Sequence, residues 1–152
     1  MPETYFFDTS ALFKRYVIED GSQSVDRLFE KKNAIFISSV TLCEVISNLR
    51  RLVDVDKIIT EEEFKSLKAT FLGDVGDESL TLIEVSTTIL LRSLDIITKK
   101  YVTPLDAVQL ATALSLPEKP VFVCADQKLL RIAENYGLSI LDPCFEIKQD
   151  GG

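Results

Sequence analysis

Four acidic residues of this chain have types and positions that could do chemistry: Asp8, Glu44, Asp106 and Asp126. Each falls at or soon after the end of an expected β-strand. In open α/β sheets, ligands bind at the edge formed by the carboxyl ends of the strands. Carboxylates gathered there would repel one another strongly unless protons or cations intervened. The pattern therefore favours a hard divalent cation such as Mg²⁺ or Mn²⁺, which prefers oxygen ligands.

The chain contains no histidine, and this absence excludes whole classes of mechanism. Ser-His-Asp and Cys-His hydrolase sites cannot form, nor can a histidine-dependent ribonuclease or a His-ligated zinc site. A divalent ion can activate water, neutralise a phosphate and stabilise a leaving oxygen without an imidazole. If the protein is a catalyst, we expect divalent metal to carry the chemistry.

Each acid also has a purely structural interpretation. Asp8 and Asp126 stand between a strand and a helix, where an N-cap acid is common. Asp106 is the third residue of a helix whose expected N-cap is Thr103, which suits a capping box. On a helical wheel, Glu44 lies opposite an apolar stripe, which favours an exposed position. We favour a shared site over four coincidences at one edge, but the sequence leaves both interpretations open.

Short apolar runs alternate along the chain with longer segments of helical spacing. The apolar runs cover residues 4–7, 34–37, 80–85, 120–125 and 138–141, and the helical segments cover residues 10–18, 22–32, 40–53, 60–72, 86–100 and 126–136, with one more that begins at Thr103. Nearly continuous apolar runs are typical of parallel strands buried on both faces. The alternation predicts an α/β domain with helices on both faces of a parallel sheet, whose strands all end on one edge. Gly73 and Gly76 are expected to end the helix that follows Thr60.

The length of 152 residues fits one domain, which we expect to span residues 1–148 and to be followed by a disordered tail at residues 149–152. An apolar content of 46% and a charged content of 27% indicate a soluble globular protein. The net charge of −7 weakens a nucleic-acid-binding interpretation without excluding it, because cations bound to the acids would offset part of it. Neither a signal peptide nor a membrane span is expected, so the expected compartment is the cytoplasm.

The cysteines and one basic pair carry weaker expectations. Cys43, Cys124 and Cys144 form no C-x-x-C pair, so neither a disulfide framework nor a zinc site is predicted. Cys43 and Cys124 lie in apolar runs and should be small buried residues. Lys14 and Arg15 follow the first acid, and we expect them on a solvated face, with a phosphate contact as the alternative.

Four short motifs, taken together, resemble those of the PIN-domain family of metal-dependent nucleases. They are FDTSAL at residues 7–12, SSVTLCE at 38–44, LDAVQLA at 105–111 and VCADQKLL at 123–130. Their order and spacing agree with the family over about residues 4–142. The length and layout are similar to those of VapC-type toxins of prokaryotic toxin–antitoxin pairs.

The resemblance implies a PIN-like three-layer α/β domain with a five-stranded parallel sheet in the order 3-2-1-4-5. It implies a metal-dependent endoribonuclease that uses Mg²⁺ or Mn²⁺ and hydrolyses RNA phosphodiester bonds. The implied catalytic and metal-binding residues are Asp8, Glu44, Asp106 and Asp126, and Ser10 takes the hydroxyl position near the first acid. The implied partners are RNA, a protein antitoxin and a second copy of the chain.

Other functions stay open. A haloacid-dehalogenase-like phosphatase needs a second acid two residues after the first, where this chain has Ser10. A phosphorylation receiver needs an aspartate at the end of the third strand, and the run at residues 80–85 contains none. The non-enzyme alternative is a PIN-like interaction module whose acids only cap helices. The apolar stretch at residues 40–72 is either core or a docking or dimer surface.

Overall fold

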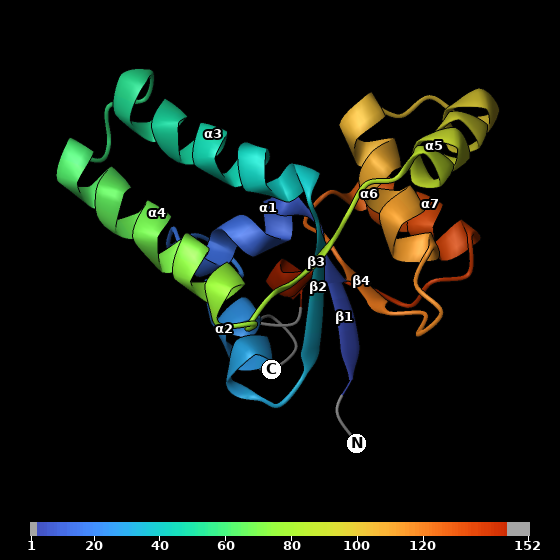
Figure 1. The fold of residues 1–152 in the computed structure, drawn as a ribbon, viewed down its shortest axis with the longest axis horizontal. Coiled ribbons are helices and arrows are strands. Elements are labelled where there is room, and N and C mark those ends of the chain that lie inside the picture. Colours follow the sequence, from blue (N-terminus) through green and yellow to red (C-terminus); the bar gives the residue numbers. More distant parts are fainter. Residues whose placement is uncertain (1–2, 146–152) are drawn as a thin grey trace.

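A parallel sheet organises the fold, which the computed structural model describes for residues 3–145 (Figure 1). Within these residues the strands are β1 (Thr4–Phe7), β2 (Ala34–Ser38), β3 (Thr81–Ile83), β4 (Val121–Val123) and β5 (Ile140–Leu141). They lie in the order β3-β2-β1-β4-β5, and every neighbouring pair is parallel. The predicted fold class and strand order are confirmed. The predicted tail at residues 149–152 and the end of the predicted domain at residue 148 lie outside the described residues.

Helices cover both faces of the sheet (Figure 1). One face carries α1 (Thr9–Leu12), the 3₁₀ turn η1 (Phe13–Arg15), α2 (Ser22–Glu30), α3 (Val40–Asp54) and α4 (Glu61–Gly76), and the other carries α5 (Thr87–Lys99), α6 (Pro104–Leu114) and α7 (Gln127–Asn135). Every predicted helical segment is present, although the first is split between α1 and η1. Among the helices of residues 3–145, none is long and apolar enough to cross a membrane.

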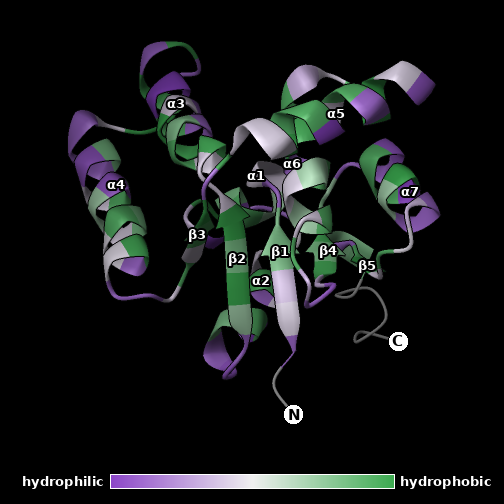
Figure 2. Ribbon diagram, turned by 45° about the vertical axis from the view of Figure 1, so that its right-hand side comes forward, coloured by the Kyte–Doolittle hydropathy of each residue, from purple (hydrophilic) through white to green (hydrophobic). Residues whose placement is uncertain are grey.

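An apolar core lies on each side of the sheet. Phe6 of β1 stacks on Phe122 of β4, with ring centres 5.8 Å apart, in the core beneath α5, α6 and α7. Phe7, the next residue of β1, belongs to the opposite core together with Phe71 of α4. Successive residues of a strand face opposite sides, so two adjacent phenylalanines serve both cores. Figure 2 shows hydrophobic residues along β2 and over the second half of β1.

Capping residues set where several helices begin and end. Thr60 and Glu63 form a capping box at the start of α4. Ser86 caps α5, and Thr103 caps α6 as predicted. Gly137 closes α7 with a φ of 94°, a conformation that glycine adopts without steric cost. These local signals fix the starts of α4, α5 and α6 and the end of α7.

The prediction that Gly73 ends its helix is wrong, whereas the helix does end at Gly76 as predicted. α4 continues through Gly73, and neither glycine has a positive φ. Phe64 and Phe71 anchor this helix in the core. Tertiary packing therefore outweighs the low helix propensity of glycine, which costs about 1 kcal/mol relative to alanine.

Replacing Gly73 by alanine is expected to raise the free energy of unfolding by roughly 0.5–1 kcal/mol. Alanine restricts the unfolded chain, and a Cβ added at position 73 would meet no atom within 4 Å. Gly137→Ala is the matched control, because its φ of +94° would strain any L side chain and should lower stability. Chemical denaturation measures both changes. A destabilised Gly73→Ala variant would contradict the open helical position described here.

Cys43 and Cys124 differ in their exposure to solvent. Cys124 is fully buried, as predicted, whereas the prediction that Cys43 is buried is wrong. α3 turns Thr41, Val45 and Leu49 inward, which leaves Cys43 on its exposed side. An apolar neighbourhood in the sequence did not reveal which face of the helix the thiol occupies.

Candidate active site

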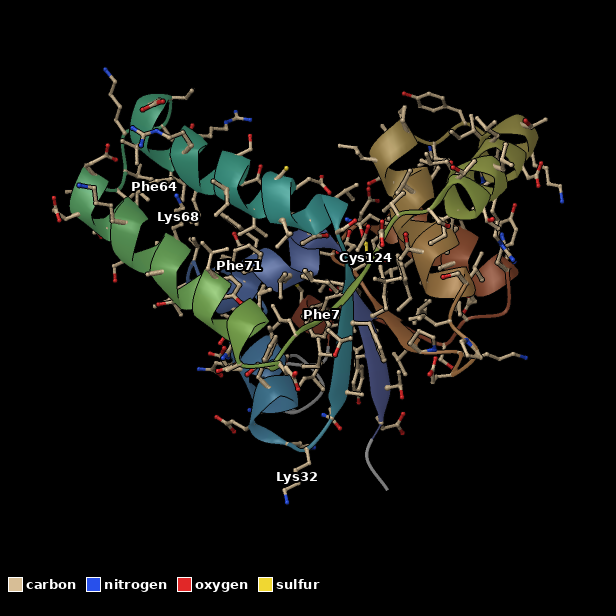
Figure 3. All side chains as sticks on the ribbon, viewed as in Figure 1. Phe7, Lys32, Phe64, Lys68, Phe71 and Cys124 are labelled. Atoms are coloured by element: carbon tan, nitrogen blue, oxygen red, sulfur yellow. The ribbon has the colours of Figure 1, made fainter. Side chains whose placement is uncertain are left out.

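A small pocket lies where helices leave the carboxyl ends of β1, β2 and β4. It has a volume of about 200 Å³ and is lined by Asp8, Thr9, Ser10, Glu44, Asn48, Asp106, Gln109 and Asp126. In Figure 3 this region surrounds the labelled Cys124, where α1, the start of α3 and α6 come together. The pocket brings together all four acids and the serine that the sequence singled out.

Asp8 ends β1 and is only 4% exposed. It is the N-cap of α1, and its Oδ1 accepts a hydrogen bond from the Ala11 N–H at 3.0 Å. Ser10 Oγ donates to the carboxylate at 2.8 Å from Oδ1 and 3.0 Å from Oδ2, and Cys124 Sγ donates to Oδ2 at 3.1 Å. Burial raises the pKa of Asp8 to about 6 against these hydrogen bonds, and the charge of Asp106 adds to the rise. Asp8 is therefore a helix cap and a buried pocket acid at once.

Ser10 connects two turns at the edge of the sheet. Its Oγ donates its one proton to the Asp8 carboxylate and accepts from the Ala125 N–H at 3.2 Å. Ala125 follows β4, so this hydroxyl ties the turn after β4 to the acid after β1. Ser10 thus has two roles, because it lies in the first turn of α1 and also fixes the orientation of the Asp8 carboxylate.

Asp106 and Asp126 lie at the starts of α6 and α7. Thr103 Oγ1 accepts from the Asp106 N–H at 3.4 Å. Asp126 Oδ1 accepts from the N–H groups of Lys128 at 2.9 Å and Leu129 at 3.4 Å. Burial raises the pKa of the half-buried Asp106, the hydrogen bond with Thr103 opposes this, and the charge of Asp126 raises it further. Asp126 therefore caps α7, Asp106 lies in the first turn of α6 capped by Thr103, and the two acids interact electrostatically.

The helical-wheel prediction that Glu44 faces solvent is wrong. Glu44 is half-buried, and its Oε1 accepts from Thr9 Oγ1 at 2.9 Å and from Gln109 Nε2 at 3.0 Å. α3 packs against the core through Val45 and Leu49, while Glu44 meets residues of α1 and α6 on another side. A wheel recognises one apolar stripe, but it gives no sign of a second, polar contact surface.

A comparison with known families agrees with the fold. The family model described as PIN domain matches residues 5–135, a span that contains all four acids. The chain belongs to the PIN domain family. This membership removes the dehalogenase-like and receiver alternatives that the sequence had left open. Among curated proteins, none matches the chain in sequence.

Solved structures with the PIN fold include components of toxin–antitoxin systems. A toxin–antitoxin complex from Klebsiella pneumoniae aligns with a TM-score of 0.64 and 17% identity, covering 91% of this chain and 97% of the other. VapBC2 from Rickettsia felis, bound to a promoter DNA fragment, aligns with a TM-score of 0.65 and 20% identity over 91% and 98% of the two chains. FitAcB from Neisseria gonorrhoeae aligns with a TM-score of 0.66 and 13% identity over 91% and 97%. At these identities the likeness establishes the fold.

The pocket of this PIN domain has the donors of a hard-cation site. Its ionisable side chains are carboxylates, and oxygen donors are those that Mg²⁺ and Mn²⁺ prefer. The raised pKa values of Asp8 and Asp106 arise mainly because burial disfavours the charged form of each carboxyl group. Across residues 3–145, however, no three Asp, Glu or Cys side chains already surround one point that could hold an ion. Side-chain rotation would therefore have to accompany the binding of a metal ion.

The expectation that Lys14 and Arg15 lie on a solvated face is wrong. Lys14 is buried and pairs with Glu19 at 3.2 Å. Arg15 pairs with Asp74 at 2.9 Å and lies 3.9 Å from the ring centre of Phe29. In this PIN domain the two cations are part of the packing beside α2 and α4, where their charges are paired with acidic side chains.

Sequence reasoning missed three polar residues of the pocket: Thr9, Asn48 and Gln109. Thr9 adjoins the first acid, and Asn48 follows Glu44 by one helical turn. Both could have been found by considering the polar residues next to each candidate acid. Gln109 is a polar side chain in an otherwise apolar stretch of α6. A buried amide in such a stretch is itself a signal that something polar lies opposite.

Proposed function

We propose that this PIN domain is a Mg²⁺- or Mn²⁺-dependent endoribonuclease that hydrolyses RNA phosphodiester bonds as the toxin of a VapBC-type pair. The observation that carries the proposal is the pocket that gathers Asp8, Glu44, Asp106 and Asp126 in a chain without histidine. PIN domains are in general nucleases, and proteins that share this fold include a toxin–antitoxin complex and VapBC2.

The four acids have different parts in the proposed mechanism. Asp8, held by Ser10, and Asp106 would be the principal ligands of a metal ion. Glu44 and Asp126 would hold a second ion or orient the attacking water as general base. A divalent cation in the pocket supplies charge neutralisation at the phosphate and lowers the pKa of water. The protein contributes the placement of the acids at the edge of a rigid sheet, so little reorganisation is needed at the moment of reaction.

Lys128 and Tyr101 offer a place for the RNA strand beside the acids. Both are exposed, and Lys128 Nζ lies 4.9 Å from the ring centre of Tyr101. The positive charge of Lys128 opposes the rise in the pKa of Asp106, so the ammonium group is close enough to interact electrostatically with the pocket. Ammonium groups attract phosphates, and exposed aromatic rings stack on unpaired bases. This pair supports single-stranded RNA as the substrate despite the acidic charge of the whole chain.

Replacing Lys128 by glutamine is expected to raise the KM for a short single-stranded RNA several-fold while kcat changes little. The variant loses one phosphate contact, so the slope of log affinity against log salt concentration should fall by about 1. Lys32→Gln is the matched control, because Figure 3 places Lys32 at the opposite end of the sheet from Cys124. Equal salt slopes for Lys128→Gln and wild type would contradict this substrate contact.

A second, larger hollow supports an antitoxin as partner. The groove between α3 and α4 has a volume of about 950 Å³ and is lined by Leu42, Cys43, Ile46, Ser47, Arg50, Arg51, Asp54, Val55, Lys68 and Leu72. Figure 3 shows Lys68 extending from α4 toward α3. Its apolar floor suits the apolar face of an amphipathic helix from an antitoxin. Residues 40–72 therefore contribute both to the core and to the proposed docking surface, because Val45 and Leu49 are buried in the core while Leu42 and Ile46 line the groove.

A homodimer and a cytoplasmic location complete the proposal. α5 exposes Leu90, Leu91 and Leu94, which together form an apolar face suited to a second copy of the chain. The cytoplasm is the compartment in which RNA substrates and an antitoxin would both meet the protein. Sedimentation of the purified chain reports the oligomeric state.

The alternative is a catalytically silent PIN-like module, since the capping bonds of Asp8 and Asp126 would serve such a module equally well. Incubation with end-labelled single-stranded RNA, and with DNA of the same sequence, separates the two functions. Internal cleavage of RNA that needs Mg²⁺ or Mn²⁺ supports the nuclease. Intact RNA with both metals, together with tight binding of a partner protein, favours the module.

A further inference from the structure

A buried amide beside the pocket connects three of the elements that carry the acids. Gln109 lies on α6 and is only 2% exposed. Its Nε2 lies 2.9 Å from Thr41 Oγ1, 3.0 Å from Glu44 Oε1 and 3.1 Å from Thr9 Oγ1. Thr41 and Glu44 belong to α3, and Thr9 follows Asp8 in the first turn of α1. One side chain of the Asp106 helix therefore reaches two of the other three acid-bearing segments, those of Asp8 and Glu44.

The number of protons in this cluster determines the direction of each hydrogen bond. A carboxylate only accepts, so Thr9 Oγ1 gives its single proton to Glu44 Oε1. The 3.2 Å contact between Thr9 and Thr41 then requires the Thr41 hydroxyl as donor. Thr41 in turn accepts from Gln109 Nε2, whose other proton is directed at Glu44 Oε1. Reversing the amide would place its oxygen against a carboxylate oxygen, so the network permits one amide orientation.

This orientation leaves the amide oxygen of Gln109 without a hydrogen bond to residues 3–145. Gln109 Oε1 is buried, and within the described part of the chain it has no hydrogen-bond partner. A buried acceptor without a hydrogen-bond partner destabilises the folded state. A methionine of similar length and volume would avoid that penalty in this apolar stretch of α6. Stability alone therefore does not explain why an amide is found here.

We propose that Gln109 is a positioning residue for Glu44. Thr9 and Gln109 both donate to Oε1 of the carboxylate, which fixes its orientation and leaves Oε2 for a cation or a water in the pocket. Gln109 also keeps α6, and with it Asp106, in register with α3. The inference rests on the proposed nuclease function and adds to it a residue that touches neither substrate nor metal.

Gln109→Met tests this role, because it keeps the size of the side chain and removes both the donor and the unmatched acceptor. The expected result is a fall in kcat for RNA cleavage of about 10- to 100-fold, the range for residues that orient metal ligands. KM for RNA should stay within about twofold, since no substrate contact is lost. The dissociation constant for Mn²⁺, measured by calorimetry, should rise, while the melting temperature should stay the same or increase.

Thr112→Val is the matched control on the same helix. Thr112 is also fully buried, but its hydroxyl bonds to the Val108 carbonyl within α6 and not to any pocket acid. It should leave kcat and Mn²⁺ affinity unchanged, whatever it does to stability. Thr41→Val removes the acceptor that orients the amide and should shift kcat and Mn²⁺ affinity in the same direction as Gln109→Met, by a smaller factor. This second variant also carries the test if Gln109→Met does not fold.

Two patterns would overturn the inference. If Gln109→Met, or Thr41→Val in its place, lowers the melting temperature but leaves kcat and Mn²⁺ affinity at wild-type values, Gln109 is a structural residue only. If kcat falls to the same extent in Thr112→Val, the effect is general to α6 and does not act through Glu44. A wild-type protein that binds Mn²⁺ without cleaving RNA would refute the proposed function instead, and the Mn²⁺ affinities would still decide the role of Gln109.

Discussion

Asp8→Asn is expected to lower the rate of RNA cleavage by about 100- to 1,000-fold, the range for loss of one group that stabilises charge in a transition state. The substitution removes the most deeply buried charge of the pocket. Asparagine is as good an N-cap as aspartate, so the bond from the Ala11 N–H can persist and the fold should survive. Single-turnover cleavage of a labelled RNA measures the effect.

Asp77→Asn is the matched control for this loss of charge. Asp77 follows α4, away from the pocket, and its carboxylate accepts from the Ser79 N–H in a turn that asparagine also favours. Cleavage by this variant should equal that of wild type. If Asp8→Asn cleaves as fast as Asp77→Asn, with both purified in parallel, Asp8 has no part in catalysis.

The metal-free protein is expected to lose stability as the pH rises from about 4 to about 7. In the folded state the pKa of Asp8 is raised from its ordinary value of 3.8 to about 6, so the folded protein holds this proton more tightly than the unfolded chain. The stabilisation is complete below pH 3.8 and is lost as the pH rises through about 6. The difference between the two pKa values is worth roughly 3 kcal/mol. Burial raises the pKa of Asp106 as well, which acts in the same direction.

Mg²⁺ should reverse this loss, because it binds the ionised carboxylates of the folded state alone. Urea denaturation between pH 4.5 and 7.5, in EDTA and in millimolar Mg²⁺, measures both effects. Asp8→Asn removes the titrating group, so its stability in EDTA should vary less with pH and should exceed that of wild type at pH 7. The lowered pKa values of Asp54 and Asp77 change stability only below this range. A wild-type stability in EDTA that rises between pH 4.5 and 7 would contradict the buried state of Asp8.

The fold was largely predictable because its signals are local. Apolar runs such as Val121–Val123 and caps such as Thr60 and Thr103 mark the elements in the sequence itself. The order of the strands is not local, and it came from the family resemblance. The error at Gly73 has the opposite origin, since packing of α4 on the core decides its helical state and propensity does not.

The site was predictable only in part, because its acids serve two purposes. Asp8, Asp106 and Asp126 look like helix-start residues and are found in that role, yet all three line the pocket. Capping and chemistry were never exclusive alternatives at these positions. The helical wheel placed Glu44 on the exposed side of α3. The role of Gln109 could be recognised only once the structure showed its hydrogen-bond partners. Contacts between elements far apart in the sequence decide both cases.

The measurement that tests the central claim most directly is single-turnover cleavage of a labelled single-stranded RNA as Mn²⁺ is added back to metal-free protein. Wild type should be inactive in EDTA and should recover internal cleavage with a saturable dependence on Mn²⁺. Asp8→Asn and Asp106→Asn should require far more Mn²⁺ or fail to recover. Cleavage that persists in EDTA, or that is restored equally in wild type and both variants, would contradict a metal-dependent site built from these acids.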